Sequence, residues 1–156
     1  RPAVAADCGT ILEFIRELGE YERLSHEVVA TEAALRETLF GPRPSAEVVL
    51  CEHDGETAAF ALFFHTYSTF LAQPGLYLED LFVRPKHRRH GIATKMMKHL
   101  ARLAVARGCG RFEWSVLDWN QPALDFYKRI GAVPMSEWTV QRLTGNALRL
   151  LAADER

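Results

Sequence analysis

The sequence contains little cysteine, no long apolar run and almost no net charge. Its three cysteines, Cys8, Cys51 and Cys109, are odd in number and widely spaced, which argues against a disulfide framework and a zinc site. No stretch has the apolar length of a membrane span, and no signal-peptide pattern is visible. A formal charge of −1 argues against a broad basic face that binds nucleic acid. We therefore expect a cytoplasmic protein that holds no metal and binds neither a membrane nor nucleic acid.

The composition and periodicity indicate one folded domain with a mixed sheet. The 156 residues, of which 48% are apolar and 25% charged, suit a single globular domain over 1–156. Apolar spacing and capping residues predict helices at 6–20, 32–40, 92–107 and 121–130. β-branched and aromatic runs, with a turn at Asp54-Gly55, predict strands at 47–51, 56–66, 76–83, 111–116 and 133–143. Because a hairpin and a strand-helix-strand crossover occur together, we expect an α/β (α+β) fold with helices on both faces of the sheet.

A short basic segment, "RPKHRRHGIATK" from Arg84 to Lys95, joins a predicted strand to a predicted helix. Gly91 and Ala93 are small residues at the entry of that helix, where the first backbone N–H groups have no internal partner and can bind an anion. Positive charge surrounds them at Arg84, Lys86, Arg88 and Arg89. A pyrophosphate would suit this arrangement, although a solvated basic loop accounts for the same residues.

Four sequence blocks extend this argument to a resemblance. "RRHGIA", from Arg88 to Ala93, resembles the R/QxxGxG/A pyrophosphate motif of the GNAT superfamily of N-acetyltransferases. "AADCGTILEFIRELGEYE", "LYLEDLFV" and "DWNQPALDFYKRIGA" are similar, in order and spacing, to its diamine and thialysine acetyltransferase branch. The resemblance covers roughly residues 1–151. It implies the GNAT fold, with a mostly antiparallel twisted sheet and a central strand-loop-helix cofactor site, acetyl-CoA as cosubstrate, and a homodimer.

The chemistry of acetyl transfer assigns candidate catalytic residues. An amine nucleophile must lose a proton, and Glu79, on the strand before the basic loop, is the candidate base. Tyr127 is the candidate acid for the departing thiolate, because a phenol can donate a proton to it. The structural alternative for Glu79 is a solvent-facing carboxylate, and the alternative for Tyr127 is an aromatic residue of the core. Asp80 is assigned to binding the cationic substrate, and it can act beside Glu79 only where the strand is bulged or splayed.

The resemblance also implies a set of cofactor contacts. Backbone amides near Leu81 and Val83 would hold the acetyl-pantetheine arm, and Asn120 would cap a helix or contact that arm. The full set of expected cofactor-binding residues is Leu81, Phe82, Val83, Arg88, Arg89, His90, Gly91, Ile92, Ala93, Thr94, Asn120, Tyr127 and Lys128.

The substrate and two competing functions remain open from the sequence. Acidic residues and the aromatic run at Tyr67 to Phe70 fit a small cationic amine, with Tyr67 as an aromatic contact. Polyamines, short diamines, ornithine-like amino acids and lysine analogues such as thialysine all satisfy this description. A CoA-binding regulatory module without turnover and an RNA-binding domain are the alternatives. A ping-pong cysteine is poorly supported, since neither Cys51 nor Cys109 has an adjacent histidine. A metal bound by His87 and His90 is poorly supported as well, since their basic loop contains no carboxylate.

Overall fold

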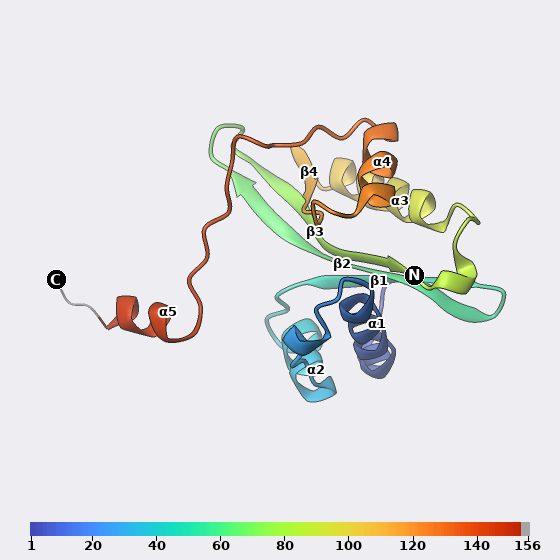
Figure 1. Ribbon diagram of the computed structural model, residues 1–156, viewed down its shortest axis with the longest axis horizontal. Coiled ribbons are helices and arrows are strands. Elements are labelled where there is room, and N and C mark those ends of the chain that lie inside the picture. Colours follow the sequence, from blue (N-terminus) through green and yellow to red (C-terminus); the bar gives the residue numbers. More distant parts are fainter. Residues whose placement is uncertain (154–156) are drawn as a thin grey trace. The chain divides into compact units, whose positions relative to one another are not determined.

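The computed structural model describes residues 1–153 and divides into two compact units (Figure 1). Residues 1–115 form the first unit, which contains the whole sheet. The remainder, from residue 116, forms the second unit. The single domain expected from the sequence therefore stays a prediction. No helix among residues 1–153 combines the length and the apolar character needed to cross a membrane.

Four strands form one mixed sheet in the order β1-β2-β3-β4. β1 and β2 are antiparallel, as are β2 and β3, whereas β3 and β4 run parallel. The turn between β1 and β2 has left-handed backbone at Asp54 (φ 52) and Gly55 (φ 77), the conformation that the Asp-Gly pair favours. The predicted mixed sheet is confirmed, with strands at Glu47–His53, Glu56–Ser68, Gln73–Val83 and Arg111–Trp114.

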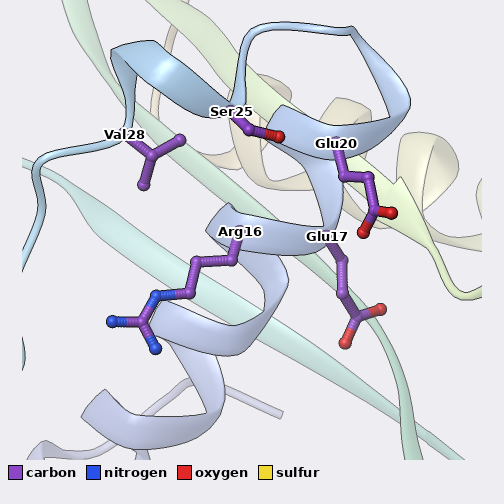
Figure 2. A pocket seen from close by; sticks show the side chains of 5 residues that line it. All are labelled: Arg16, Glu17, Glu20, Ser25 and Val28. Carbon is purple, nitrogen blue, oxygen red and sulfur yellow. The ribbon is translucent and has the colours of Figure 1, made fainter.

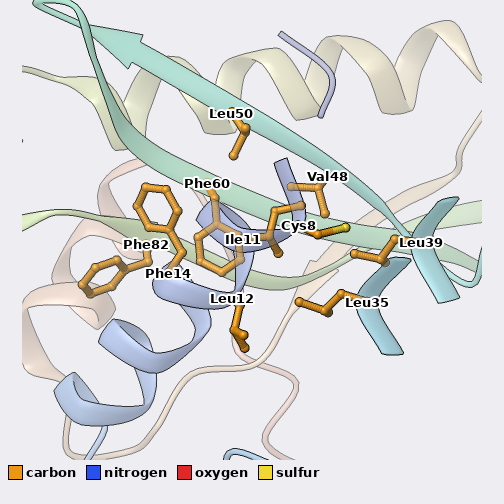
Figure 3. Close-up of a cluster of buried hydrophobic side chains, with 10 residues drawn as sticks. All are labelled: Cys8, Ile11, Leu12, Phe14, Leu35, Leu39, Val48, Leu50, Phe60 and Phe82. Atoms are coloured by element: carbon orange, nitrogen blue, oxygen red, sulfur yellow. The ribbon is translucent and has the colours of Figure 1, made fainter. Parts of the chain in front are cut away.

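Helices cover both faces of this sheet, as the sequence predicts (Figure 1). Helices α1 (Cys8–Tyr21) and α2 (Glu32–Phe40) bury one face, where Phe14 stacks on Phe60 with ring centroids 5.1 Å apart. Helix α3 (Ile92–Ala106) contacts β2, β3 and β4. Short 3-10 turns lie at Ala5–Asp7, Ser25–Glu27 and Pro85–His87. Figure 3 shows the core beneath α1 and α2, formed by Cys8, Ile11, Leu12, Phe14, Leu35, Leu39, Val48, Leu50, Phe60 and Phe82.

The second unit contains helices α4 (Gln121–Arg129) and α5 (Gly145–Ala152). Helix α4 and its Asn120 cap confirm the prediction for 121–130. The strands predicted at 133–143 are wrong: this segment is irregular, and Val133, Trp138 and Val140 are exposed. A strand needs a neighbouring strand for its backbone hydrogen bonds, and within residues 1–153 none pairs with this segment. The sequence pattern also gave no indication of α5.

Candidate active site

The two acidic residues of β3 lie at an irregularity in the sheet. Leu62 of β2 pairs with Asp80, but the next residue, Phe63, pairs with Leu78, so Glu79 has no partner and forms a bulge. Glu79 is exposed, whereas Asp80 is partly buried. The bulge that the two acids require in order to act together is therefore confirmed.

Asp80 has the most strongly altered acidity among the described residues. Burial, together with the negative charges of Glu79 and Glu22, raises its pKa from 3.8 to about 7. Glu22 follows the end of α1, and burial raises its own pKa as well. A substrate cation placed here would supply the positive charge that stabilises the ionised form of Asp80. Sequence reasoning missed Glu22, because nothing in a single sequence shows that the end of α1 approaches β3.

The edge of β3 next to the acids is open. Pairing between β3 and β4 ends at Leu78 and Trp114, so the rest of β3 pairs only with β2. The N–H of Arg84 donates to the carbonyl of Ala58 on β2 at 2.9 Å. Since strand residues alternate in hydrogen-bonding direction, the amides of Leu81 and Val83 face away from β2, toward the open edge. These are the two positions expected to hold an extended ligand chain.

The loop that follows β3 has the backbone of an anion site. Arg89 (φ 65) and Gly91 (φ 70) both adopt the left-handed conformation, which is typical of loops whose N–H groups form an anion-binding concavity. Gly91 caps α3 without a side-chain hydrogen bond, so the first amides of the helix, from Ile92 to Thr94, have no acceptor within the helix. A diphosphate is an anion of the size and charge that such a site binds.

Most of the loop's basic side chains are engaged within the protein. Arg84 pairs with Glu17 at 2.8 Å and Glu13 at 3.2 Å on α1, and its guanidinium lies 4.3 Å from the centroid of the Phe14 ring. Lys86 pairs with Glu56.

Arg88 and Arg89 are both exposed, and the side chain of Arg88 is engaged within the protein. The Nε of Arg88 donates to the carbonyl of Val83 at 2.9 Å, and its guanidinium lies over the rings of Tyr21 and Phe82. The site therefore presents backbone amides more than free cationic side chains, which sequence reasoning did not anticipate.

The loop is braced against the β1-β2 hairpin by histidines. His87 is buried, and its Nε2 lies 3.1 Å from a carboxylate oxygen of Glu56. The Nδ1 of His90 lies 3.1 Å from the carbonyl of His87, and the ring of His53 packs against both histidines. Among residues 1–153 no group of three or more His, Cys, Asp or Glu could hold a metal ion.

The remaining predicted residues lie elsewhere. Tyr67 is exposed near the end of β2, where it pairs with Pro74. Strand alternation puts Tyr67 on the sheet face opposite Asp80, so the structure does not bring these two together.

Tyr127 and Lys128 lie on α4 in the second unit, and Asn120 caps that helix by accepting from the N–H of Ala123 at 3.4 Å. The ring of Tyr127 packs against Phe126, with centroids 5.5 Å apart. The capping half of the prediction for Asn120 is therefore confirmed.

A hollow of about 390 Å³ lies between α1 and the segment that contains the 3-10 turn Ser25–Glu27 (Figure 2). Its lining residues are Arg16, Glu17, Glu20, Ser25 and Val28. None of the predicted site residues lines this hollow. The candidate site is instead formed by the β3 bulge and by the loop at 84–91 with the first amides of α3, which we call the anion loop.

Comparison with known proteins identifies the family. The family model described as Acetyltransferase (GNAT) family matches residues 12–132. The chain belongs to this family. Thialysine N-epsilon-acetyltransferase of Sus scrofa is 40% identical over 97% of this chain and 95% of that protein. L-ornithine N5-acetyltransferase of Arabidopsis thaliana is 34% identical over 97% of this chain and 86% of that protein.

Solved structures agree with the GNAT fold. An integron cassette protein from the mobile metagenome of V. cholerae superposes with a TM-score of 0.82 at 27% identity, covering 99% of this chain and 96% of that one. The expected family and fold are confirmed, and this GNAT protein is an N-acetyltransferase, an enzyme that transfers an acetyl group to an amine.

Proposed function

We propose that this GNAT enzyme transfers the acetyl group of acetyl-CoA to a primary amine of a small cationic substrate, such as a diamine, a polyamine or a lysine analogue like thialysine. The observation that carries the proposal is the β3 bulge. It places two carboxyl groups beside an open strand edge and just before a loop of anion-binding amides. The names of the relatives, which include thialysine and L-ornithine acetyltransferases, support amines of this class.

Acetyl-CoA would supply an activated thioester, and the described residues fit its parts. The loop at 88–94 would bind the pyrophosphate through backbone amides, with Arg88 and Arg89 as exposed cationic side chains. The amides of Leu81 and Val83 would pair with the pantetheine arm at the open edge of β3, and the thioester carbonyl would be polarised there. Asn120 and Lys128 are the other expected contacts of the cosubstrate.

Direct attack in a ternary complex accounts for the remaining residues. Asp80 holds the substrate cation, and Glu79 takes a proton from the ammonium, directly or through water, so that the neutral nitrogen can attack. The new C–N bond forms as the C–S bond breaks, the acetylated nitrogen releases its second proton to solvent, and Tyr127 donates a proton to the departing thiolate. Glu79 and Tyr127 then exchange protons with solvent.

Thiol release from acetyl-CoA tests the proposal. We expect turnover with several members of a panel of polyamines, diamines, L-lysine and thialysine, and acetylated amine as the second product. A protein that binds acetyl-CoA but releases no thiol above the hydrolysis rate with any amine would instead be a CoA-binding module.

A homodimer and a cytoplasmic location complete the proposal. The three cysteines are free, which is typical of proteins in a reducing compartment. Sedimentation equilibrium of the full chain measures the oligomeric state, and a mass of one chain would remove the homodimer.

A further inference from the structure

Three successive pairs of side chains lie on the α1 face of β2 and β3. Phe60 pairs with Phe82 beneath α1, Leu62 pairs with Asp80, and Phe64 pairs with Tyr77. Phe60 and Phe82 are buried under the helix (Figure 3), whereas Phe64 and Tyr77 are only partly buried. The Phe64 and Tyr77 rings lie 5.1 Å apart, so they form an aromatic surface next to Asp80 and beyond the core beneath α1.

The bulge is the reason that Asp80 and Tyr77 share this face. They are three residues apart, and in a regular strand such residues point to opposite faces. The extra residue, Glu79, restores Tyr77 to the face of Asp80. The hydroxyl of Tyr77 lies 2.7 Å from the hydroxyl of Ser115, just beyond the end of β4, which fixes the direction of the ring.

Two charged residues of β4 lie on the same face. Glu113 pairs with Tyr77, and Arg111 pairs with Gly75, so alternation places both beside the aromatic surface. Glu113 is partly buried and Arg111 is exposed. Neither forms an ion pair within residues 1–153. Both charges are therefore available to a ligand.

We propose that Phe64, Tyr77, Glu113 and Arg111 form the subsite for the far end of the substrate, and that this end is an amino-acid head group. The inference rests on the proposed function, which puts the reacting amine at Glu79 and Asp80. The two rings carry the methylene chain, Glu113 binds the α-ammonium group, and Arg111 binds the α-carboxylate. Asp80 and Tyr77 are separated by about one two-residue repeat along β3, and Glu113 lies one strand spacing from Tyr77. The backbone positions of Asp80 and Glu113 are therefore roughly 8 Å apart. A side chain of lysine length can cover this span.

Substrates of matched length test each residue separately. For wild type, Glu113→Gln and Arg111→Gln, kcat and KM are measured with a diamino acid, the diamine of the same chain length and the corresponding monoamine. We expect Glu113→Gln to raise KM for the diamino acid and the diamine roughly tenfold relative to the monoamine. We expect Arg111→Gln to raise KM roughly tenfold for the diamino acid relative to the diamine.

Two further variants complete the design. Tyr77→Leu removes the ring and should raise KM for all three substrates, whereas Tyr77→Phe, which keeps the ring, should recover most of the loss. Glu37→Gln neutralises an exposed glutamate on α2 and serves as the matched charge control, with unchanged KM ratios.

The possible failures are distinguishable. If the wild type releases thiol with these amines but Glu113→Gln and Arg111→Gln leave the KM ratios unchanged, the subsite is wrong and the proposed function stands. If the wild type binds acetyl-CoA and releases no thiol with any amine, the proposed function itself fails.

Discussion

Asp80 shows how one buried side chain can make amine binding depend on pH. A carboxyl group with a pKa of about 7 is largely protonated at pH 6 and largely ionised at pH 8. Only the ionised form attracts an ammonium group. The acetyltransferase would therefore bind its substrate more tightly as the pH rises through neutrality.

Asp80→Asn should remove this dependence. For the wild type we expect the dissociation constant of an amine substrate, measured without acetyl-CoA, to fall as pH rises from 6 to 8, because Asp80 ionises. The asparagine variant should bind weakly and show no inflection near pH 7. Isothermal titration across this range checks the prediction, and an unchanged inflection in the variant would assign the titration to another group.

Asp80 also predicts an effect of pH on stability. Rising pH should strengthen substrate binding but lower the stability of the fold. The folded-state pKa of about 7 lies above the ordinary value of 3.8, so the folded protein binds the proton more tightly than the unfolded chain. The free energy of unfolding should therefore fall as pH rises from about 4 to about 7. Asp80→Asn should be more stable than the wild type at pH 8, by roughly 2 to 4 kcal/mol at most. Guanidinium unfolding of both proteins at pH 5 and pH 8 measures this difference in the free energy of unfolding. The same difference between variant and wild type at both pH values would contradict the prediction.

Arg84 connects the start of the anion loop to α1. Its guanidinium contacts two glutamates, the Phe14 ring and the carbonyl of Thr57 at 3.1 Å. The charge that looked from the sequence like a phosphate ligand thus has a structural partner on another element.

Arg84→Met should destabilise the fold by roughly 1 to 3 kcal/mol, because the carbonyl of Thr57 and two glutamates lose a donor. Arg36→Met, at an exposed position of α2, is the matched control and should change the free energy of unfolding by less than about 0.5 kcal/mol. Urea midpoints of the two variants give the comparison. Equal midpoints would mean that the Arg84 contacts are too exposed to contribute.

At the scale of the element, the loop between β3 and α3 combines an ordinary sequence pattern with an unusual backbone. A small residue before an amphipathic helix is visible in the sequence. The left-handed conformation at Arg89 cannot be read from the sequence. Arg89 has a Cβ, so this backbone is held only by the surrounding structure. The histidine contacts to the β1-β2 hairpin provide part of that support.

Gly91→Ala tests whether the backbone shape of this loop determines acetyl-CoA binding, apart from any loss of stability. Alanine in a left-handed conformation costs about 1 kcal/mol or more, although a Cβ here meets no atom within 4 Å. We expect weaker acetyl-CoA binding, because the strain shifts the amides that form the anion site. Gly55→Ala, at a similar φ of +77 in the hairpin turn, is the matched control.

The control should lose comparable stability and keep its affinity for acetyl-CoA. Fluorescence or calorimetric titration with acetyl-CoA checks both variants. Equal affinities would show that the anion binds elsewhere.

At the scale of the whole molecule, the proposed chemistry draws residues from both units. Glu79 and Asp80 lie in the unit of residues 1–115, whereas Tyr127 belongs to the second unit.

Tyr127→Phe should lower kcat by roughly a hundredfold or more, the usual contribution of a general acid, because phenylalanine has no proton to donate. The dissociation constant for acetyl-CoA should change much less, since the anion loop is intact. Steady-state kinetics with a thiol reagent, together with an acetyl-CoA titration, separates the two quantities. Equal turnover in the variant would remove Tyr127 from the mechanism.

Local sequence determined most of the elements and the candidate residues of this enzyme. Apolar spacing, the Thr31 and Asn120 caps and the Asp54-Gly55 turn act over a few residues, so they can be read without knowing the fold. The tertiary structure alone decided that Asp80 is buried beside Glu22, that Arg84 pairs with α1, and that Tyr77 shares the face of Asp80.

Each of these depends on contacts between residues far apart in the chain, or on a bulge whose position is set by strand pairing. The strands expected at 133–143 failed for the same reason, because a strand exists only where another strand pairs with it.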